Sequence, residues 1–206
     1  MAKGASPRKV EAGNTVALNM HALGTLQYIR ASIDAAGLLA VPGSAGITMG
    51  SVGCVAALVA AHPALAHHWL AIWIAAAITA FLCGSAVMVH QAVSARSTFY
   101  RGPVRKFLLC LSPPLVAGAL LTVALYQHHD ESLIPGAWLL LYGSAVAAAS
   151  TLTVRSVGVM GVLFMALGVL ALPLSPAAAN WVLGAGFGGL HLVFGVLIGW
   201  MNHEQR

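Results

Sequence analysis

Long stretches of this sequence carry no ionised side chain. Residues 41–95, 107–129, 132–154 and 156–203 contain no Asp, Glu, Lys or Arg. A hydrocarbon core about 30 Å thick needs about 20 helical residues at about 1.5 Å each. The stretches are unbroken and do not alternate between apolar and polar residues, which favours helices over a barrel. The sequence therefore predicts an all-α polytopic membrane protein.

The composition excludes several classes of soluble protein. Of the 206 residues, 59% are apolar and 7% are charged, whereas soluble domains carry about 25% charged residues. A soluble enzyme, a nucleic-acid-binding protein and a disulfide-rich secreted scaffold are therefore excluded. The net charge of +5 comes from short basic clusters between apolar stretches, which is typical of membrane topology rather than of direct nucleic-acid binding.

The apolar stretches divide into six predicted spans. Pro135 is placed to start the fourth span, and Pro173 and Pro176 to close the fifth. We expect one bundle of six transmembrane helices over residues 41–203, followed by a cytoplasmic tail at 204–206. The spans are Ser44–Ala61, Trp69–Val89, Phe107–Tyr126, Pro135–Val154, Arg155–Leu172 and Asn180–Met201.

The positions of the basic residues predict the orientation. The connections at 62–68, 127–134 and 173–179 contain no Lys or Arg, whereas residues 90–106 contain four. With six spans, all ten basic residues fall on one side, and basic loops stay in the cytoplasm. We therefore expect a multi-pass protein of the cytoplasmic (inner) membrane with both termini inside.

Residues 1–40 are expected to form a cytoplasmic segment with an amphipathic helix over Asn14–Ala36. Apolar residues recur there at three- and four-residue intervals, and Arg30 and Asp34 form a helical i,i+4 pair. Two interpretations stay open. The helix packs along the interface beneath the bundle, or it provides a docking face for a cytosolic partner.

Two internal similarities compete as descriptions of the chain. Pairs of Pro-Gly and Gly-Ser relate the first span to the fourth, in an inverted repeat of spans 1–3 and 4–6. A Met-Gly pair followed by a tryptophan instead relates the hairpin of spans 1–2 to that of spans 5–6. The first similarity uses Pro42-Gly43, Gly50-Ser51, Pro135-Gly136 and Gly143-Ser144, and the second uses Met49-Gly50, Trp69, Met160-Gly161 and Trp181.

Several short motifs extend over most of the chain from about Tyr28 onward. They are Tyr28-Ile29-Arg30, Val41-Pro42-Gly43, Met49-Gly50, Gly102-Pro103 with Arg105-Lys106-Phe107, Pro113-Pro114, Pro135-Gly136 with Trp138, and Gly186-Phe187-Gly188-Gly189-Leu190-His191. Together they resemble a family of small six-span bacterial membrane proteins with no assigned function. Members of that family often accompany a winged-helix transcriptional regulator, so the resemblance implies a regulatory or accessory role. It brings no catalytic or binding residue to any position here.

His191 is the only ionisable side chain near the middle of any predicted span. Glycines at 184, 188, 195 and 199 share its helical face, and small residues let helix backbones approach closely. We therefore expect His191 to point into the bundle. Thr79 and Ser144 are predicted at a similar depth, roughly 15 Å from the cytoplasmic end. Either a hydroxyl bonds the neutral imidazole, or His191 centres a ligand or proton site, because polar groups inside membranes suggest function.

Pro113 and Pro114 interrupt the third predicted span. Consecutive prolines remove two amide donors and free the carbonyls of Leu109 and Cys110, which need partners inside a membrane. One interpretation is a kink in which Ser112 satisfies the freed carbonyls. The other is a broken helix that forms the binding site of a carrier.

Histidines and two carboxylates gather in the connections that are expected on the outer face. Imidazole and carboxylate groups are suitable zinc or copper ligands, but adjacent histidine pairs lack the i,i+4 spacing of a metallohydrolase helix. We expect solvated interfacial histidines, with a metal site or a pH response as alternatives. The residues are His62, His67, His68, His128, His129, Asp130 and Glu131.

The sequence lacks the motifs of the common enzyme classes. It contains no GxSxG, HExxH, P-loop or dinucleotide fingerprint, so an enzyme is disfavoured and we expect no catalytic residue and no cofactor. The first functional hypothesis is a non-catalytic membrane accessory or sensor that acts through cytosolic or membrane protein partners, with an oligomer as one option. The alternative is a small solute or lipid carrier with a site at His191 and the Pro113-Pro114 break.

Overall fold

The computed structural model describes residues 24–26, 42–94, 101–153 and 155–204. All regular elements in these ranges are helices, and no strand occurs in them, which confirms the predicted all-α class for the described residues. The chain divides into one unit of residues 1–37 and a second of residues 38–206. Because only residues 24–26 of the first unit are described, the amphipathic helix over Asn14–Ala36 lies almost wholly outside the described residues and stays a prediction.

The described part of the second unit is a series of long helices joined by short 3-10 turns. The helices are α2 (Gly43–Ala60), α3 (Trp69–Ser94), α4 (Arg101–Gln127), α5 (Ile134–Ala149), α6 (Arg155–Ala171) and a last helix that runs through α7 (Pro176–Leu183), a π-helical stretch (Gly184–Leu190) and α8 (His191–Glu204). The 3-10 turns are η1 (Pro63–His68), η3 (Glu131–Leu133) and η4 (Ser150–Leu152).

Five of the described helical segments are long and apolar enough to cross a membrane by length and composition. They coincide with the first, second, third, fourth and sixth predicted spans. The fifth predicted span is α6, which is apolar but only 17 residues long. The last helix begins at Pro176 rather than at Asn180, because a proline fits the first turn of a helix, where its missing N–H costs nothing.

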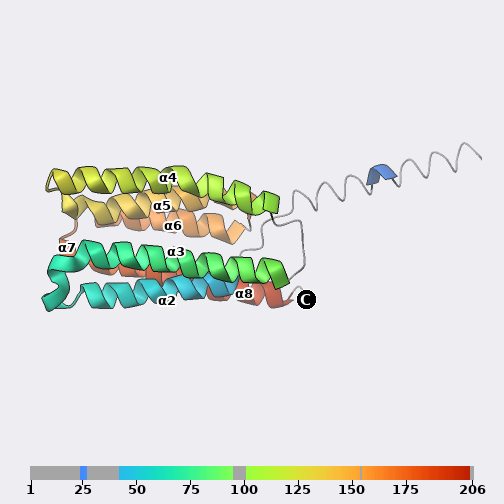
Figure 1. The fold of residues 1–206 in the computed structure, drawn as a ribbon, viewed down its shortest axis with the longest axis horizontal. Coiled ribbons are helices and arrows are strands. Elements are labelled where there is room, and N and C mark those ends of the chain that lie inside the picture. The colour runs from blue at the N-terminus through green and yellow to red at the C-terminus, as the bar shows by residue number, and fades with distance from the viewer. Residues whose placement is uncertain (1–23, 27–41, 95–100, 154, 205–206) are drawn as a thin grey trace, which may run out of the picture. The chain divides into compact units, whose positions relative to one another are not determined.

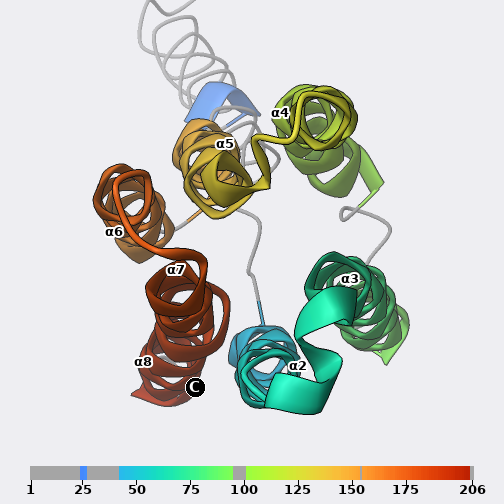
Figure 2. The ribbon, with the colours of Figure 1, turned by 90° about the vertical axis from the view of Figure 1, so that its left-hand side faces the viewer.

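The long helices of the second unit lie in two rows when viewed end on (Figure 2). One row holds α4, α5 and α6, and the other holds α3, α2 and the last helix. Within the rows, α5 packs on α4 and α6, and α2 packs on α3 and the last helix. The packed neighbours run side by side along their length (Figure 1). The helices α2 and α5 are therefore the centres of the two rows.

Glycines bring the backbone of α2 against the backbone of the last helix. A Cβ atom added at Gly50 would lie 2.7 Å from the Leu192 nitrogen, and one added at Gly195 would lie 2.7 Å from the Ile47 nitrogen. Both distances are much shorter than van der Waals contact, so no larger residue fits without a shift of the helices. The small face predicted for the last helix is thus the face that packs on α2.

A second glycine seam joins α5 to α6. A Cβ atom added at Gly161 would lie 2.6 Å from the Ala147 nitrogen, and one added at Gly168 would lie 2.8 Å from the Leu140 nitrogen. Close backbone approach increases van der Waals contact, which is the main attraction between helices in apolar surroundings. Each row therefore contains one pair of helices in backbone contact.

The two seams follow neither repeat suggested by the sequence. In an inverted repeat of spans 1–3 and 4–6, the last helix corresponds to α4, so the glycines of α5 would face α4. Gly143 instead faces Gly161 of α6. In the hairpin repeat, the last helix corresponds to α3, so Gly161 would face α3, whereas it faces Gly143 and Ala147 of α5. The matching glycines therefore do not occupy equivalent contacts. The neighbours of the two central helices do correspond as an inverted repeat requires, since α2 packs on α3 and the last helix and α5 packs on α6 and α4, so both repeats stay predictions.

The first prediction tests the seam between α2 and α8. We expect Gly195→Ala to lower the free energy of unfolding by about 1–3 kcal/mol, because the added methyl group forces the two backbones apart. Gly199→Ala is the matched control, since a Cβ atom there meets nothing within 4 Å, and it should cost less than about 0.5 kcal/mol. Unfolding in bicelles measures both values, and equal losses would contradict the seam.

Candidate functional site

His191 opens α8 and lies between the two rows of helices. Its side chain is 5% exposed, and its Nε2 atom lies 2.8 Å from the hydroxyl oxygen of Tyr142 on α5. The ring centroid lies 5.3 Å from that of Phe164 on α6 and 6.4 Å from that of Phe187 in the π-helical stretch. The imidazole therefore lies inside the bundle, as its glycine-rich face predicts.

The two hydroxyls expected near His191 are bonded to their own helices. Thr79 donates to the carbonyl of Ala75 at 2.8 Å, and Ser144 donates to the carbonyl of Leu141 at 2.8 Å. Serine and threonine inside helices commonly bond a carbonyl of the preceding turn. Tyr142 takes the role expected of them, because depth along a helix says nothing about the direction in which a side chain points.

The second ring nitrogen of His191 is left without a partner. Nδ1 is buried and has no hydrogen bond to any described residue. The backbone of Gly186 and Phe187 interacts favourably with the ring. Both belong to the π-helical stretch, a form that is rare and often found at functional sites. This nitrogen is the one polar feature of the His191 surroundings that the protein's own contacts leave open.

Aromatic rings fill the space around the pair of Tyr142 and His191. Tyr142 contacts the ring edges of Phe164 and Phe187, with centroid distances of 4.9 and 5.1 Å. Phe187 in turn lies 6.2 Å from Trp73 of α3. Offset and edge-to-face aromatic pairs add stabilisation beyond the area that they bury. The aromatic cluster therefore joins helices of both rows at the level of His191.

Asn180 on α7 makes a polar contact that the sequence analysis missed. Its side chain is 3% exposed, and its Oδ1 accepts from the indole Nε1 atoms of Trp73 at 2.9 Å and Trp69 at 3.2 Å. Its Nδ2 donates to the carbonyl of Ala57 at 3.0 Å. One amide group thus joins α2, α3 and α7. A single asparagine in an apolar segment is costly unless it is fully bonded, and this rule could have identified it.

A tryptophan contact continues this network into the other row. The indole rings of Trp69 on α3 and Trp138 on α5 stack with centroids 6.1 Å apart. Trp138 donates from Nε1 to the hydroxyl of Thr122 on α4 at 2.7 Å. We call Trp69, Trp138 and Thr122 the tryptophan clasp. It joins α3, α5 and α4 at the end of the bundle where α3 and α5 begin.

The helix α4 runs without interruption through Pro113 and Pro114. The hydroxyl of Ser112 donates to the carbonyl of Leu109 at 3.3 Å, which is the acceptor that Pro113 leaves free. This is the contact expected of a kink that Ser112 satisfies. The described contacts of His191 come from α5, α6 and the π-helical stretch, so the structure does not bring the two prolines and His191 into one site.

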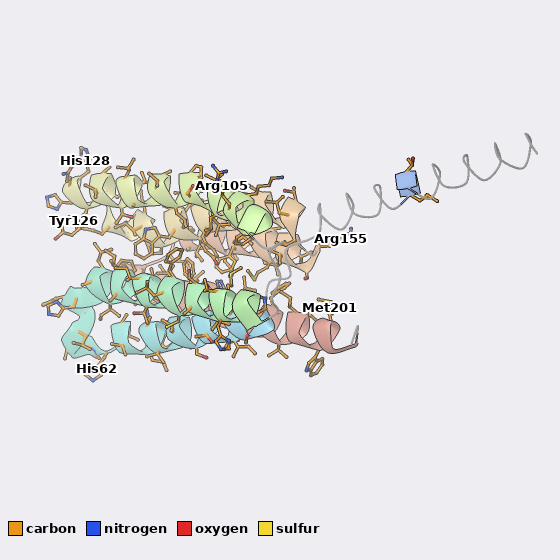
Figure 3. The ribbon with its side chains drawn as sticks, turned by 45° about the vertical axis from the view of Figure 1, so that its right-hand side comes forward. His62, Arg105, Tyr126, His128, Arg155 and Met201 are labelled. Carbon is orange, nitrogen blue, oxygen red and sulfur yellow. The ribbon has the colours of Figure 1, made fainter. Side chains whose placement is uncertain are left out.

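The histidines of the connections lie at one end of the second unit. Figure 3 shows His62, which follows α2, and His128, which follows α4, at the same end. The Nδ1 atom of His62 accepts from the Ala64 amide at 3.3 Å and so caps η1. Within the described ranges, no three or more His, Cys, Asp or Glu side chains, His67, His68 and His129 included, are placed to hold a metal ion. The five histidines are therefore not gathered into the metal site considered as an alternative.

No family model, curated protein or solved structure matches this chain. The resemblance to a bacterial six-span family therefore stays an expectation. The roles of His191, Tyr142 and Asn180 rest on their contacts alone.

The second prediction tests the Asn180 network. We expect Asn180→Ala to lower the free energy of unfolding by about 1–2 kcal/mol, because two indole N–H groups lose their acceptor in apolar surroundings. The Ala57 carbonyl loses one of its two donors and keeps the Ala61 amide. Thr79→Val is the control, since the Thr79 hydroxyl bonds only its own helix among the described contacts, and it should cost less than about 0.5 kcal/mol. Unfolding in bicelles provides the comparison; an Asn180→Ala variant as stable as Thr79→Val would show that the network contributes nothing.

Proposed function

We propose that this chain is a six-span protein of the cytoplasmic membrane that acts as a non-catalytic accessory or sensor through protein partners. The observation that carries this proposal is that the polar groups in the apolar helices bond to other parts of the bundle. Asn180, Tyr142 and Trp138 bond to other helices, and the hydroxyls of Thr79 and Ser144 bond to their own. These groups hold the bundle together instead of converging on a substrate.

Exposed apolar surface supports the membrane location. Leu120 of α4 is 68% exposed and Leu82 of α3 is 60% exposed, and many other large apolar side chains of both helices are similarly open. Soluble monomers rarely expose apolar patches of such extent. The helix α6 serves as the sixth span in this proposal. Its length of roughly 26 Å is close to the hydrocarbon thickness, and a small mismatch costs little.

The distribution of charge supports the proposed orientation. Arg105, Lys106 and Arg155 lie near the starts of α4 and α6. In Figure 3, Arg105 and Arg155 lie toward the end opposite His62 and His128. Basic residues flank the cytoplasmic ends of membrane spans, so we propose that both termini and these residues lie inside.

A small carrier with a site at His191 is the second candidate. The unbonded Nδ1 atom favours it, because unpaired polar groups are costly in a membrane and often functional. Against it, Tyr142, Phe164 and Phe187 surround the imidazole closely, which leaves a solute little access. We therefore place the accessory or sensor first.

The third prediction separates these two candidates. Native mass spectrometry of the full chain, purified from its own membrane in mild detergent, is expected to find a protein partner at fixed stoichiometry. Deletion of residues 1–40 should release the partner, because that segment is the expected docking element, whereas His191→Gln should retain it. Circular dichroism of each variant controls for folding. A small molecule that the full chain retains and His191→Gln loses, in the absence of any protein partner, would contradict the accessory and favour the carrier.

A further inference from the structure

We propose that the apolar faces of α3 and α4 bind an anionic phospholipid of the cytoplasmic leaflet, with its phosphate held by Arg105 and Lys106. The inference rests on the proposed membrane location. It also deepens the proposed function, because it names a membrane component to which such a sensor responds. Its support comes from exposure, from the residue types on the two faces, from the tryptophan clasp and from charge.

The helices α3 and α4 are the least covered of the long helices. In the most apolar window of each, 11% of the residues are buried inside the molecule, against 39–44% for α2, α5 and the last helix. Each packs on the centre of its own row, and the two lie at neighbouring edges of the rows (Figure 2). These faces therefore depend on their surroundings for an apolar cover.

The residue types on these faces favour lipid over another helix. The two pairs of helices in backbone contact are joined at glycines, and small residues are typical of close helix interfaces in membranes. The open faces of α3 and α4 carry large side chains instead, among them Ile78, Leu82, Val116 and Leu120. Flexible acyl chains adapt to such a surface, whereas a second helix could not bring its backbone into contact with it.

The tryptophan clasp lies far enough from Lys106 to leave room for an acyl chain along α3 and α4. It joins α3 to α4 through Trp69, Trp138 and Thr122 at one end of the bundle. From Lys106 to Thr122, α4 rises roughly 24 Å, which exceeds one leaflet of a hydrocarbon core of about 30 Å. A chain that enters beside Lys106 therefore lies along both helices for a full leaflet before it reaches the clasp.

The basic residues near the start of α4 favour an anionic lipid headgroup. Arg105 and Lys106 are exposed, and the sequences of α3 and α4 contain no Asp or Glu. Basic groups between helices on the cytoplasmic side of a membrane bind anionic headgroups. The cations at the start of α4, without a carboxylate on either helix, attract a phosphatidylglycerol more strongly than a zwitterionic phosphatidylcholine.

The fourth prediction uses the purified, delipidated full chain in detergent. Titration with phosphatidylglycerol, followed by native mass spectrometry, is expected to show one tightly bound lipid, with phosphatidylcholine at least tenfold weaker. Arg105→Gln should weaken phosphatidylglycerol binding about fivefold, since one cation near the headgroup is lost. Arg155→Gln removes a charge from α6 and is the matched control, with a change of less than about twofold expected.

A second measurement locates the acyl chain. In a Trp181→Phe/Trp200→Phe/Val116→Trp variant the two most exposed tryptophans are removed and a new one replaces an exposed residue of α4, roughly 15 Å along the helix from Lys106. One equivalent of phosphatidylglycerol with brominated chains should quench this tryptophan. Equal binding of the two lipids, equal losses for Arg105→Gln and Arg155→Gln, or a lipid-free dimer would overturn the proposal. Such a dimer would mean that the open faces of α3 and α4 bind a second copy of the chain. The lipid titration contains no protein partner, so a failure to bind phosphatidylglycerol would not count against the accessory proposal. Equally, failure to find a protein partner in the third prediction would not count against the lipid site.

Discussion

Polar groups inside long apolar helices must find partners within the chain, and this constraint organises the second unit. The backbone groups are bonded within the helices, so glycines can bring two backbones together without exposing either. Gly195 does this between α8 and α2, and Gly161 does it between α6 and α5. Each seam fixes the core of one row, and the contacts of His191 with Tyr142 and of Trp69 with Trp138 then join the two rows.

The contacts between the rows are fewer but more specific. His191 bonds Tyr142 amid aromatic rings, while Asn180 ties Trp69 and Trp73 to the network that continues through the tryptophan clasp. A single amide or imidazole in apolar surroundings has few alternative partners, so such bonds specify one arrangement of the helices. The outward faces of α3 and α4, which carry exposed side chains such as Leu82 and Leu120, take no part in these contacts, which is why we assign those faces to the surrounding lipid.

The helices could be predicted from the sequence, but most of the site could not. Freedom from charge and sufficient length are properties of one segment, so both bounds of α2 lie within one residue of those expected. The helix α4 instead begins at Arg101, well before the predicted Phe107, because a helix can extend beyond its apolar span. The choice of Tyr142 as the partner of His191 depends on how α5 and α8 rotate against each other, which no local pattern records. Asn180 is the first residue of the predicted sixth span, and its bonds to Trp69, Trp73 and Ala57 depend on how α2, α3 and α7 pack. The π-helical stretch could not be predicted, because its residue pattern does not distinguish a π-helix from a glycine-rich α-helix.

The most direct test of the account is whether the short helix α6 crosses the membrane. Single cysteines are introduced by Arg155→Cys at the start of α6 and by Ser175→Cys in the connection that follows it, in a chain whose three native cysteines are replaced by alanine. Intact cells are then labelled with a membrane-impermeant maleimide. The account predicts that Ser175→Cys reacts from outside and that Arg155→Cys reacts only after permeabilisation. Labelling of both cysteines from the same side would contradict six spans.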